Sequence, residues 1–188
     1  IEVDLDRVDE IGREIPVLVD LKPTGQHYME DLHRAGGLTP LLRQLGPLLE
    51  LDCLTITGKS LGENVRAARP DWPQTVVRPL ENPIHAGGGL AILKGNIAPR
   101  GAVIKKAAAN AALCRHRGRA VVFENLADLA DRIDSADLDV GPDDILVLRN
   151  AGPKGGPGMP EAGYIPIPKK LAQQGVKDMV RISDARMS

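Results

Sequence analysis

Apolar and polar positions in the first part of the chain predict a strand followed by three helices. The apolar run 15–21 (IPVLVDL) is typical of a short buried strand, and the Lys-Pro-Thr-Gly that follows it is typical of a turn. Apolar residues recur at helical spacing in 28–35, 40–51 and 61–68. Gly46-Pro47 should break or bend the second helix, because proline removes a backbone donor.

The second part of the chain reads mainly as short strands. Strand-like runs cover 90–94, 102–105, 119–123, 144–148 and 179–182. One helix is expected over 125–133, with Asn125 as its N-terminal cap. Many short strands with few helices favour a barrel or a sandwich of mixed pairing.

A proline-rich stretch separates the first part of the chain from the strand-rich second part. Pro70, Pro73, Pro79 and Pro83 fall within a segment that neither a helix nor a central strand would accept. We therefore predict a domain boundary near Pro79, with an α/β part over 1–79 and a β domain over 80–188.

Composition and charge narrow the classes of partner. Hydrophobic residues make up 43% and charged residues 26%, as in a globular protein, whereas aromatics are only 2% and the net charge is -1. A nucleic-acid partner is not expected, because basic patches and stacking aromatics are missing. No apolar run reaches the roughly 20 residues of a bilayer span, and no secretory signal opens the chain. With two cysteines only, we expect a cytoplasmic protein and no membrane partner.

The segment 150–161 (NAGPKGGPGMPE) is the most unusual in the chain. Its glycines would let backbone amides approach an anion closely, and its prolines would stiffen the loop. A crossover loop without chemistry is the simpler interpretation for such a composition. Glu161 changes this balance, because a carboxylate at the end of a stiff loop can bind a hard cation such as Mg²⁺.

Other candidate sites are weaker. The G-x-G-x-x-G pattern fails because Glu161 occupies its last glycine, and a phosphate loop ending at Ser60 fails because Cys53 occupies its first. Cys53 reads as a buried thiol and Cys114 as incidental. Ser188 ends the segment SDARMS, where a serine is ordinarily a turn residue or a cap. It could act as a base only beside a Lewis acid or a cation.

Five stretches of the chain carry a family resemblance: PVLVDLKPTGQHYMEDLHRAGG, DCLTITGKSLGEN, GGLAILKGNIAPRGAVIK, GPKGGPGMPEAGYIPIPKKL and RISDARMS. Together they resemble the dihydroxy-acid and phosphogluconate dehydratase family, including its sugar-acid (aldonate) branch. The segments around the glycine loop and SDARMS resemble the sugar-acid branch more than the branched-chain biosynthetic enzymes.

The resemblance implies a two-domain enzyme. A larger N-terminal α/β domain would carry three cysteines for an iron–sulfur cluster and most of the magnesium ligands. A C-terminal β-barrel similar to the swivelling domain of aconitase would follow it. This chain would then hold the end of the first domain (1–79) and most of the barrel (80–188), incomplete at its C-terminus.

The resemblance also assigns roles to particular residues. Glu161 would be a magnesium ligand and Ser188 the catalytic base. The substrate or active-site loop residues would be Lys154, Gly155, Gly156, Gly158 and Arg186.

The chain departs from the family in its cysteines. Neither Cys53 nor Cys114 lies in a cluster motif, so the cluster, expected to be [2Fe–2S] rather than [4Fe–4S], would be bound by a missing N-terminal part. Because the first residue is Ile1 rather than Met and the chain stops just after a strand-like run, we expect a fragment. Because it cannot hold the cluster, we expect it to be inactive alone.

The implied reaction is dehydration of an aldonic acid to its 2-keto-3-deoxy acid by a homodimer or homotetramer. Mg²⁺ would acidify the C2 proton for Ser188, and the cluster would assist the departing C3 hydroxyl. Two alternatives remain: a dihydroxy-acid dehydratase of branched-chain amino-acid biosynthesis, and a non-catalytic swivel or binding module.

Overall fold

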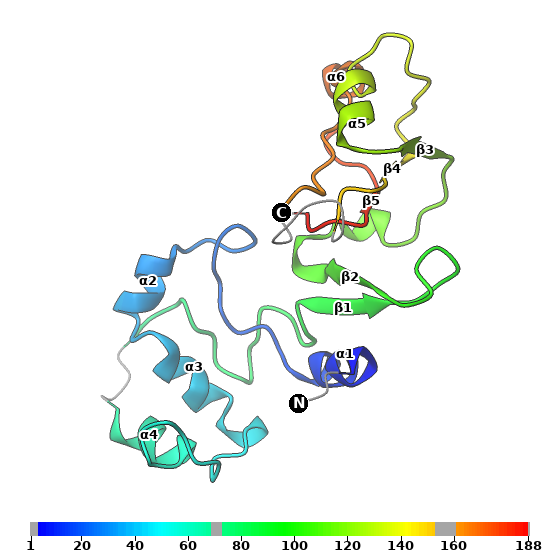
Figure 1. Ribbon diagram of the computed structural model, residues 1–188. Coiled ribbons are helices and arrows are strands. Elements are labelled where there is room, and N and C mark those ends of the chain that lie inside the picture. The colour runs from blue at the N-terminus through cyan, green and yellow to red at the C-terminus, as the bar shows by residue number, and fades with distance from the viewer. Residues whose placement is uncertain (1–3, 69–72, 153–160, 188) are drawn as a thin grey trace. The chain divides into compact units, whose positions relative to one another are not determined.

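The structure is a computed structural model that describes residues 4–68, 73–152 and 161–187. The chain divides into two compact units, Ile1–Ala109 and Asn110–Ser188, and each is described by itself (Figure 1). The domain boundary near Pro79 stays a prediction.

The first unit contains four α-helices and a two-stranded sheet among its described residues. Strands β1 (Leu90–Leu93) and β2 (Ala102–Lys105) lie within the ranges predicted for them, and they pair antiparallel. The helical elements are α1 (Leu5–Glu14), α2 (Met29–Arg34), α3 (Leu38–Gln44), α4 (Leu61–Ala67) and the 3₁₀ turns η1 (Gly46–Leu48) and η2 (Lys106–Ala108).

Local capping explains where these helices begin and end. Ser60 and Glu63 form a reciprocal capping box at the start of α4, with donor–acceptor distances of 3.1 and 2.7 Å. This hydrogen bonding holds the pKa of the Glu63 carboxyl below its ordinary value. The predicted break at Gly46-Pro47 is confirmed, because α3 stops at Gln44 and η1 follows. Helix α1, capped by Asp4, was not predicted.

The predicted strand 15–21 is extended but belongs to no regular sheet. It makes isolated bridges, including Val17 with His85 and Val19 with Val77. A small core formed by Leu32, Ala35, Val76 and Val77 packs against Val19 and Leu21 of this segment.

The second unit is a parallel sheet in which helices connect neighbouring strands. The strand order is β3-β4-β5, with Phe123, Leu148 and Ser183 in register at its carboxyl edge. The described elements in chain order are η3 (Ala111–Leu113), β3 (Ala120–Phe123), α5 (Leu126–Arg132), β4 (Ile145–Leu148), α6 (Lys169–Gln173) and β5 (Arg181–Ser183).

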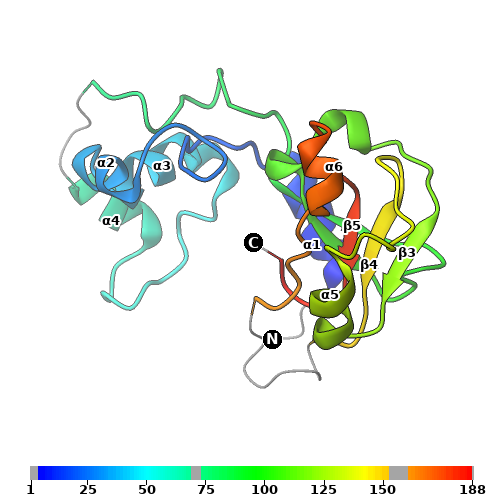
Figure 2. The ribbon, with the colours of Figure 1, turned by 90° about the horizontal axis from the view of Figure 1, so that it is seen from above.

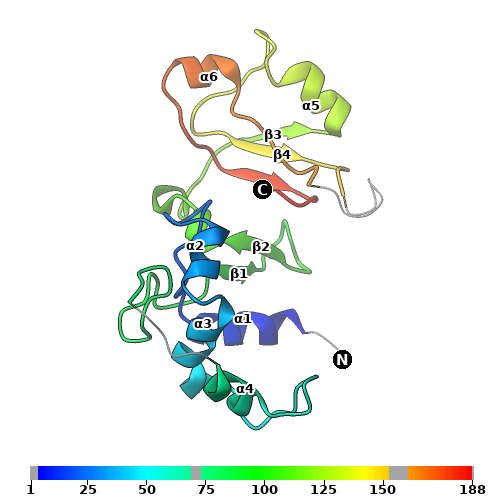
Figure 3. The same cartoon turned by 90° about the vertical axis from the view of Figure 1, so that its left-hand side faces the viewer.

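Both helices of this unit cover the same face of the sheet (Figures 2 and 3). Leu129 of α5 and Leu171 of α6 join Phe123 and Leu148 in one core. Asn125 caps α5 as predicted, since its side chain accepts the Asp128 N–H at 2.9 Å. Burial of this apolar face stabilises the unit and leaves the strand ends to carry loops.

The predicted barrel is not found among the described residues. They form two separate small sheets and no closed barrel, and the second unit mixes helices with parallel strands. The physical reason is that parallel neighbours need long crossovers, and α6, which the sequence reading missed, lies in one of them. No helix in the described part of the chain has the length and apolarity to cross a membrane.

Candidate functional site

The loops that leave the three parallel strands meet at one edge of the sheet. Because Phe123, Leu148 and Ser183 are in register, Glu124, Arg149 and Asp184 begin neighbouring loops. Open α/β sheets bind ligands at the carboxyl ends of their strands. This edge is therefore the natural place for a site in the second unit.

The carboxylate of Asp184 binds the loop that follows β4. Its Oδ2 accepts the Asn150 N–H at 2.9 Å, and its Oδ1 accepts the N–H groups of Ala151 at 3.0 Å and Gly152 at 3.3 Å. Three backbone donors on one carboxylate fix the position of the loop relative to β5.

Asn150 extends this hydrogen-bonded network to β3. Its backbone has a φ of 55°, a left-handed conformation that asparagine tolerates better than most residues. Its Nδ2 donates to the Glu124 carbonyl at 2.9 Å, and Arg149 forms an ion pair with Glu124 at 3.0 Å. All three loops at the carboxyl edge are thus joined.

Glu161 and Arg186, two residues selected from the sequence, lie together. Arg186 Nη2 is 3.3 Å from Glu161 Oε1, and both side chains are about half exposed to solvent. Between them the Gly163 N–H donates to the Arg186 carbonyl at 2.9 Å. A Cβ at Gly163 would fall 2.6 Å from the Ala185 carbonyl oxygen, so this contact requires glycine.

The remaining selected residues lie outside the described part of the chain. These are Lys154, Gly155, Gly156, Gly158 and Ser188. The roles assigned to all seven residues therefore stay predictions.

Metal donors are sparse at this edge. Among the described residues no three His, Cys, Asp or Glu side chains gather as a metal site. Glu161 offers one hard oxygen donor, which suits Mg²⁺ as a single ligand among others that come from elsewhere.

The described cysteines do not fit an iron–sulfur cluster. Cys53 and Cys114 are both exposed and lie in different units. The expectation of a buried Cys53 is wrong, because it begins a loop whose apolar neighbours Leu54 and Ile56 are also exposed. A cluster would require ligands from other parts of the protein.

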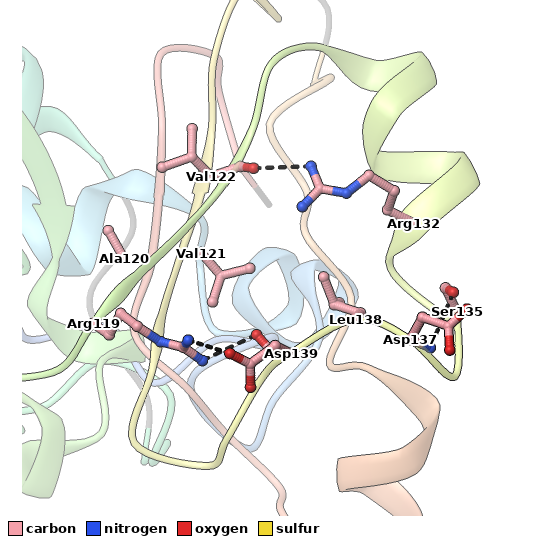
Figure 4. A pocket seen from close by; sticks show the side chains of 9 residues that line it. All are labelled: Arg119, Ala120, Val121, Val122, Arg132, Ser135, Asp137, Leu138 and Asp139. Atoms are coloured by element: carbon pink, nitrogen blue, oxygen red, sulfur yellow. Dashed lines mark hydrogen bonds and ion pairs between the residues drawn. The ribbon is translucent and has the colours of Figure 1, made fainter.

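A cavity of about 380 Å³ lies beside β3, and neither Glu161 nor Arg186 lines it (Figure 4). Arg119 at one end binds Asp139 and Asp144, and Arg132 at the other binds the Val122 carbonyl at 3.1 Å and Asp128 at 2.9 Å. The Arg119 guanidinium lowers the pKa of both its carboxyl partners. These arginines already have anionic partners, so their contacts are structural.

Asp184 and Asn150 were missed as site residues in the sequence. A usable signal existed for Asp184, since it directly follows a strand whose carboxyl end should reach the same edge as the glycine-rich loop. The left-handed conformation of Asn150 had no such signal.

Comparison with known proteins covers both parts of the chain. Residues 75–188 match the domain described as dihydroxy-acid/6-phosphogluconate dehydratase C-terminal, and residues 1–64 match the N-terminal domain of the same description.

Three curated relatives illustrate the range of the similarity. An L-arabonate dehydratase of Azospirillum brasilense is 54% identical over 181 residues, covering 95% of this chain and 31% of the relative. An L-arabinonate dehydratase of Rhizobium leguminosarum bv. trifolii is 44% identical over 190 residues, covering 100% and 33%. A dihydroxy-acid dehydratase of Methanobrevibacter smithii is 42% identical over 188 residues, also covering 100% and 33%. The chain spans about a third of the length of each.

Proposed function

The chain belongs to the dihydroxy-acid/6-phosphogluconate dehydratase family, and from this premise we propose that its protein dehydrates an aldonic acid to a 2-keto-3-deoxy acid. The observation that carries the proposal is the family match over both parts of the chain. The pairing of Glu161 with Arg186 at the carboxyl edge supports it, because a hydroxy acid needs cationic donors and a metal-binding carboxylate.

The sugar-acid branch is favoured over the biosynthetic branch. The L-arabonate dehydratase shares 54% identity with the chain, against 42% for the dihydroxy-acid dehydratase named above. The segment around Glu161 and the ending SDARMS also resemble the sugar-acid enzymes.

Three residues of the chain, Arg186, Glu161 and Ser188, are each proposed to contribute one part of the dehydration. Arg186 presents N–H donors that can hold the substrate carboxylate, in exchange for its contact with Glu161. Glu161 would be one ligand of Mg²⁺, which when bound polarises the carboxylate and the C2 hydroxyl of the substrate. Ser188 would take the C2 proton as general base.

The atoms balance as a loss of water. The C2–H bond and the C3–O bond break, the proton and the hydroxyl leave as water, and the resulting enol tautomerises to the 2-keto-3-deoxy acid. No step is assigned to an iron–sulfur cluster, because the described cysteines do not fit one. For the complete protein we propose that a cluster is held by other residues.

The same proposal extends to the fold, the location and the oligomeric state of the complete protein. The β domain over 80–188 would be a swivel-like barrel in the complete protein, which would act in the cytoplasm as a homodimer or homotetramer. These statements rest on the family resemblance and need the complete protein for their test.

The test is a keto-acid assay of the complete, anaerobically purified protein. Pentonic and hexonic acids are compared with a branched 2,3-dihydroxy acid, with Mg²⁺ present and absent. Turnover of one or more aldonic acids in preference to the branched acid is expected. Preference for the branched acid would reassign the protein to the biosynthetic branch, and no turnover together with an iron-free, colourless preparation would favour a non-catalytic module.

A further inference from the structure

The two ends of the connection that follows β4 are anchored on one short segment, Asp184–Arg186. On one side the Asp184 carboxylate accepts the N–H groups of Asn150, Ala151 and Gly152. On the other side the Arg186 carbonyl accepts the Gly163 N–H, and the Arg186 guanidinium pairs with Glu161. The segment therefore joins the start of one loop at the carboxyl edge to the end that carries Glu161.

Close packing leaves this segment little freedom. A Cβ at Gly152 would lie 3.0 Å from the Ala185 Cβ, and one at Gly163 would lie 2.6 Å from the Ala185 carbonyl oxygen. Ala185 is thus held between two glycines. Its own N–H donates to Ser183 Oγ at 3.1 Å, which fixes the turn out of β5.

We propose that Asp184 is a positioning residue of the active site, which sets the place of Arg186, and through it Glu161, by anchoring the loop after β4. The inference rests on the proposed function and adds to it a residue that touches no reacting atom. A hydrogen-bonded carboxylate suits this task because its two oxygens accept several backbone donors at once. Displacing catalytic groups by about 1 Å can cost on the order of 100-fold in rate.

Asp184→Asn is the informative substitution because it preserves shape. The amide keeps one oxygen for Ala151 and Gly152, but it turns an NH₂ group toward the Asn150 N–H, where an acceptor is required. Asp184→Ala removes both acceptors. Asp134→Asn is the matched control, since Asp134 also accepts a distant backbone N–H, that of Lys169 at 3.0 Å, but follows α5 and not a strand end.

The experiment measures steady-state kinetics and amide exchange on the complete protein. We expect kcat to fall about 10-fold in Asp184→Asn and about 100-fold in Asp184→Ala, and KM to rise in both variants because Arg186 is displaced from the substrate carboxylate. Hydrogen–deuterium exchange should rise in the peptide that covers 149–152. Asp134→Asn should keep kcat within about 2-fold.

The outcomes separate this inference from the proposed function. An active parent enzyme whose Asp184→Asn variant keeps its kcat and its exchange pattern would overturn the positioning role alone. An equal loss in Asp134→Asn would also overturn it, because the effect would then be general instability. A parent enzyme without dehydratase activity on any acid would overturn both. If Asp184→Ala does not fold, Asp184→Asn decides by itself.

Discussion

Arg186 Nη2 lies 3.3 Å from Glu161 Oε1, and this contact links the end of the glycine-rich loop to the segment that leaves β5. The two residues were selected from the sequence for different reasons, one as a metal ligand and one as a loop residue. Because the two side chains form an ion pair, removing the charge of one also changes the electrostatic environment of the other.

Glu161→Gln should weaken magnesium binding in the complete protein. The amide keeps the size of the side chain but loses the negative charge that a hard cation prefers. We expect about 10- to 100-fold more Mg²⁺ to be needed for half-maximal activity, measured by titrating activity with Mg²⁺ after chelation. Glu124→Gln is the control, because Glu124 is at the same edge and pairs with Arg149. An equal shift in both variants would contradict a specific role.

Arg186→Gln should weaken substrate binding. Loss of a guanidinium removes charge-assisted donors for a carboxylate, and we expect KM to rise about 10-fold or more. Arg149→Gln, which changes the exposed arginine of the same edge, should leave KM nearly unchanged. An unchanged KM in Arg186→Gln would show that the substrate carboxylate is held elsewhere.

Ser188→Ala should abolish most turnover without abolishing binding. A general base contributes typically about 10²- to 10⁴-fold, so kcat should fall by at least about 100-fold. Equilibrium dialysis with the preferred acid should still detect binding. Turnover within a few-fold of the parent would remove Ser188 from the mechanism.

Gly163→Ala should destabilise the second unit. The added methyl would lie 2.6 Å from a backbone oxygen that cannot move without shifting the segment after β5. Overpacking of this kind costs about 1–3 kcal/mol, measurable as a lower denaturant midpoint. Gly95→Ala is the control, since a Cβ there meets no atom within 4 Å. Equal midpoints for the two variants would show that the segment relaxes freely.

Acid should weaken the contacts around Arg119. The pKa of Asp139 and of Asp144 is lowered from 3.8 chiefly by hydrogen bonds from Arg119. A lowered pKa in the folded state means that the stabilisation is present above pH 3.8 and is lost as the pH falls through the folded-state values. Urea unfolding at pH 6 and pH 3 should therefore show a smaller acid effect in Arg119→Gln, and an unchanged acid effect would exclude this cause. The difference should be modest, because the Arg119 and Asp139 side chains are more than half exposed to solvent and their ion pair is screened.

Much of the secondary structure could be predicted because its causes are local. The cap at Asn125, the helix break at Gly46-Pro47 and the apolar strands depend only on neighbours along the chain. Helix α1 was not predicted, although Asp4 caps it. None of its residues is buried in the structure. Glu161 and Arg186 were selected through the family resemblance of their segments, which is also local information.

The family resemblance, the short elements and the residues worth testing follow from the amino-acid sequence, because each is read from neighbouring positions. The parallel pairing of β3, β4 and β5 and the binding of Asp184 to Asn150, Ala151 and Gly152 emerge only in the folded chain. Strand pairing and loop anchoring join residues that are far apart along the chain. Their free energy depends on which groups meet after folding, and no local pattern carries that information.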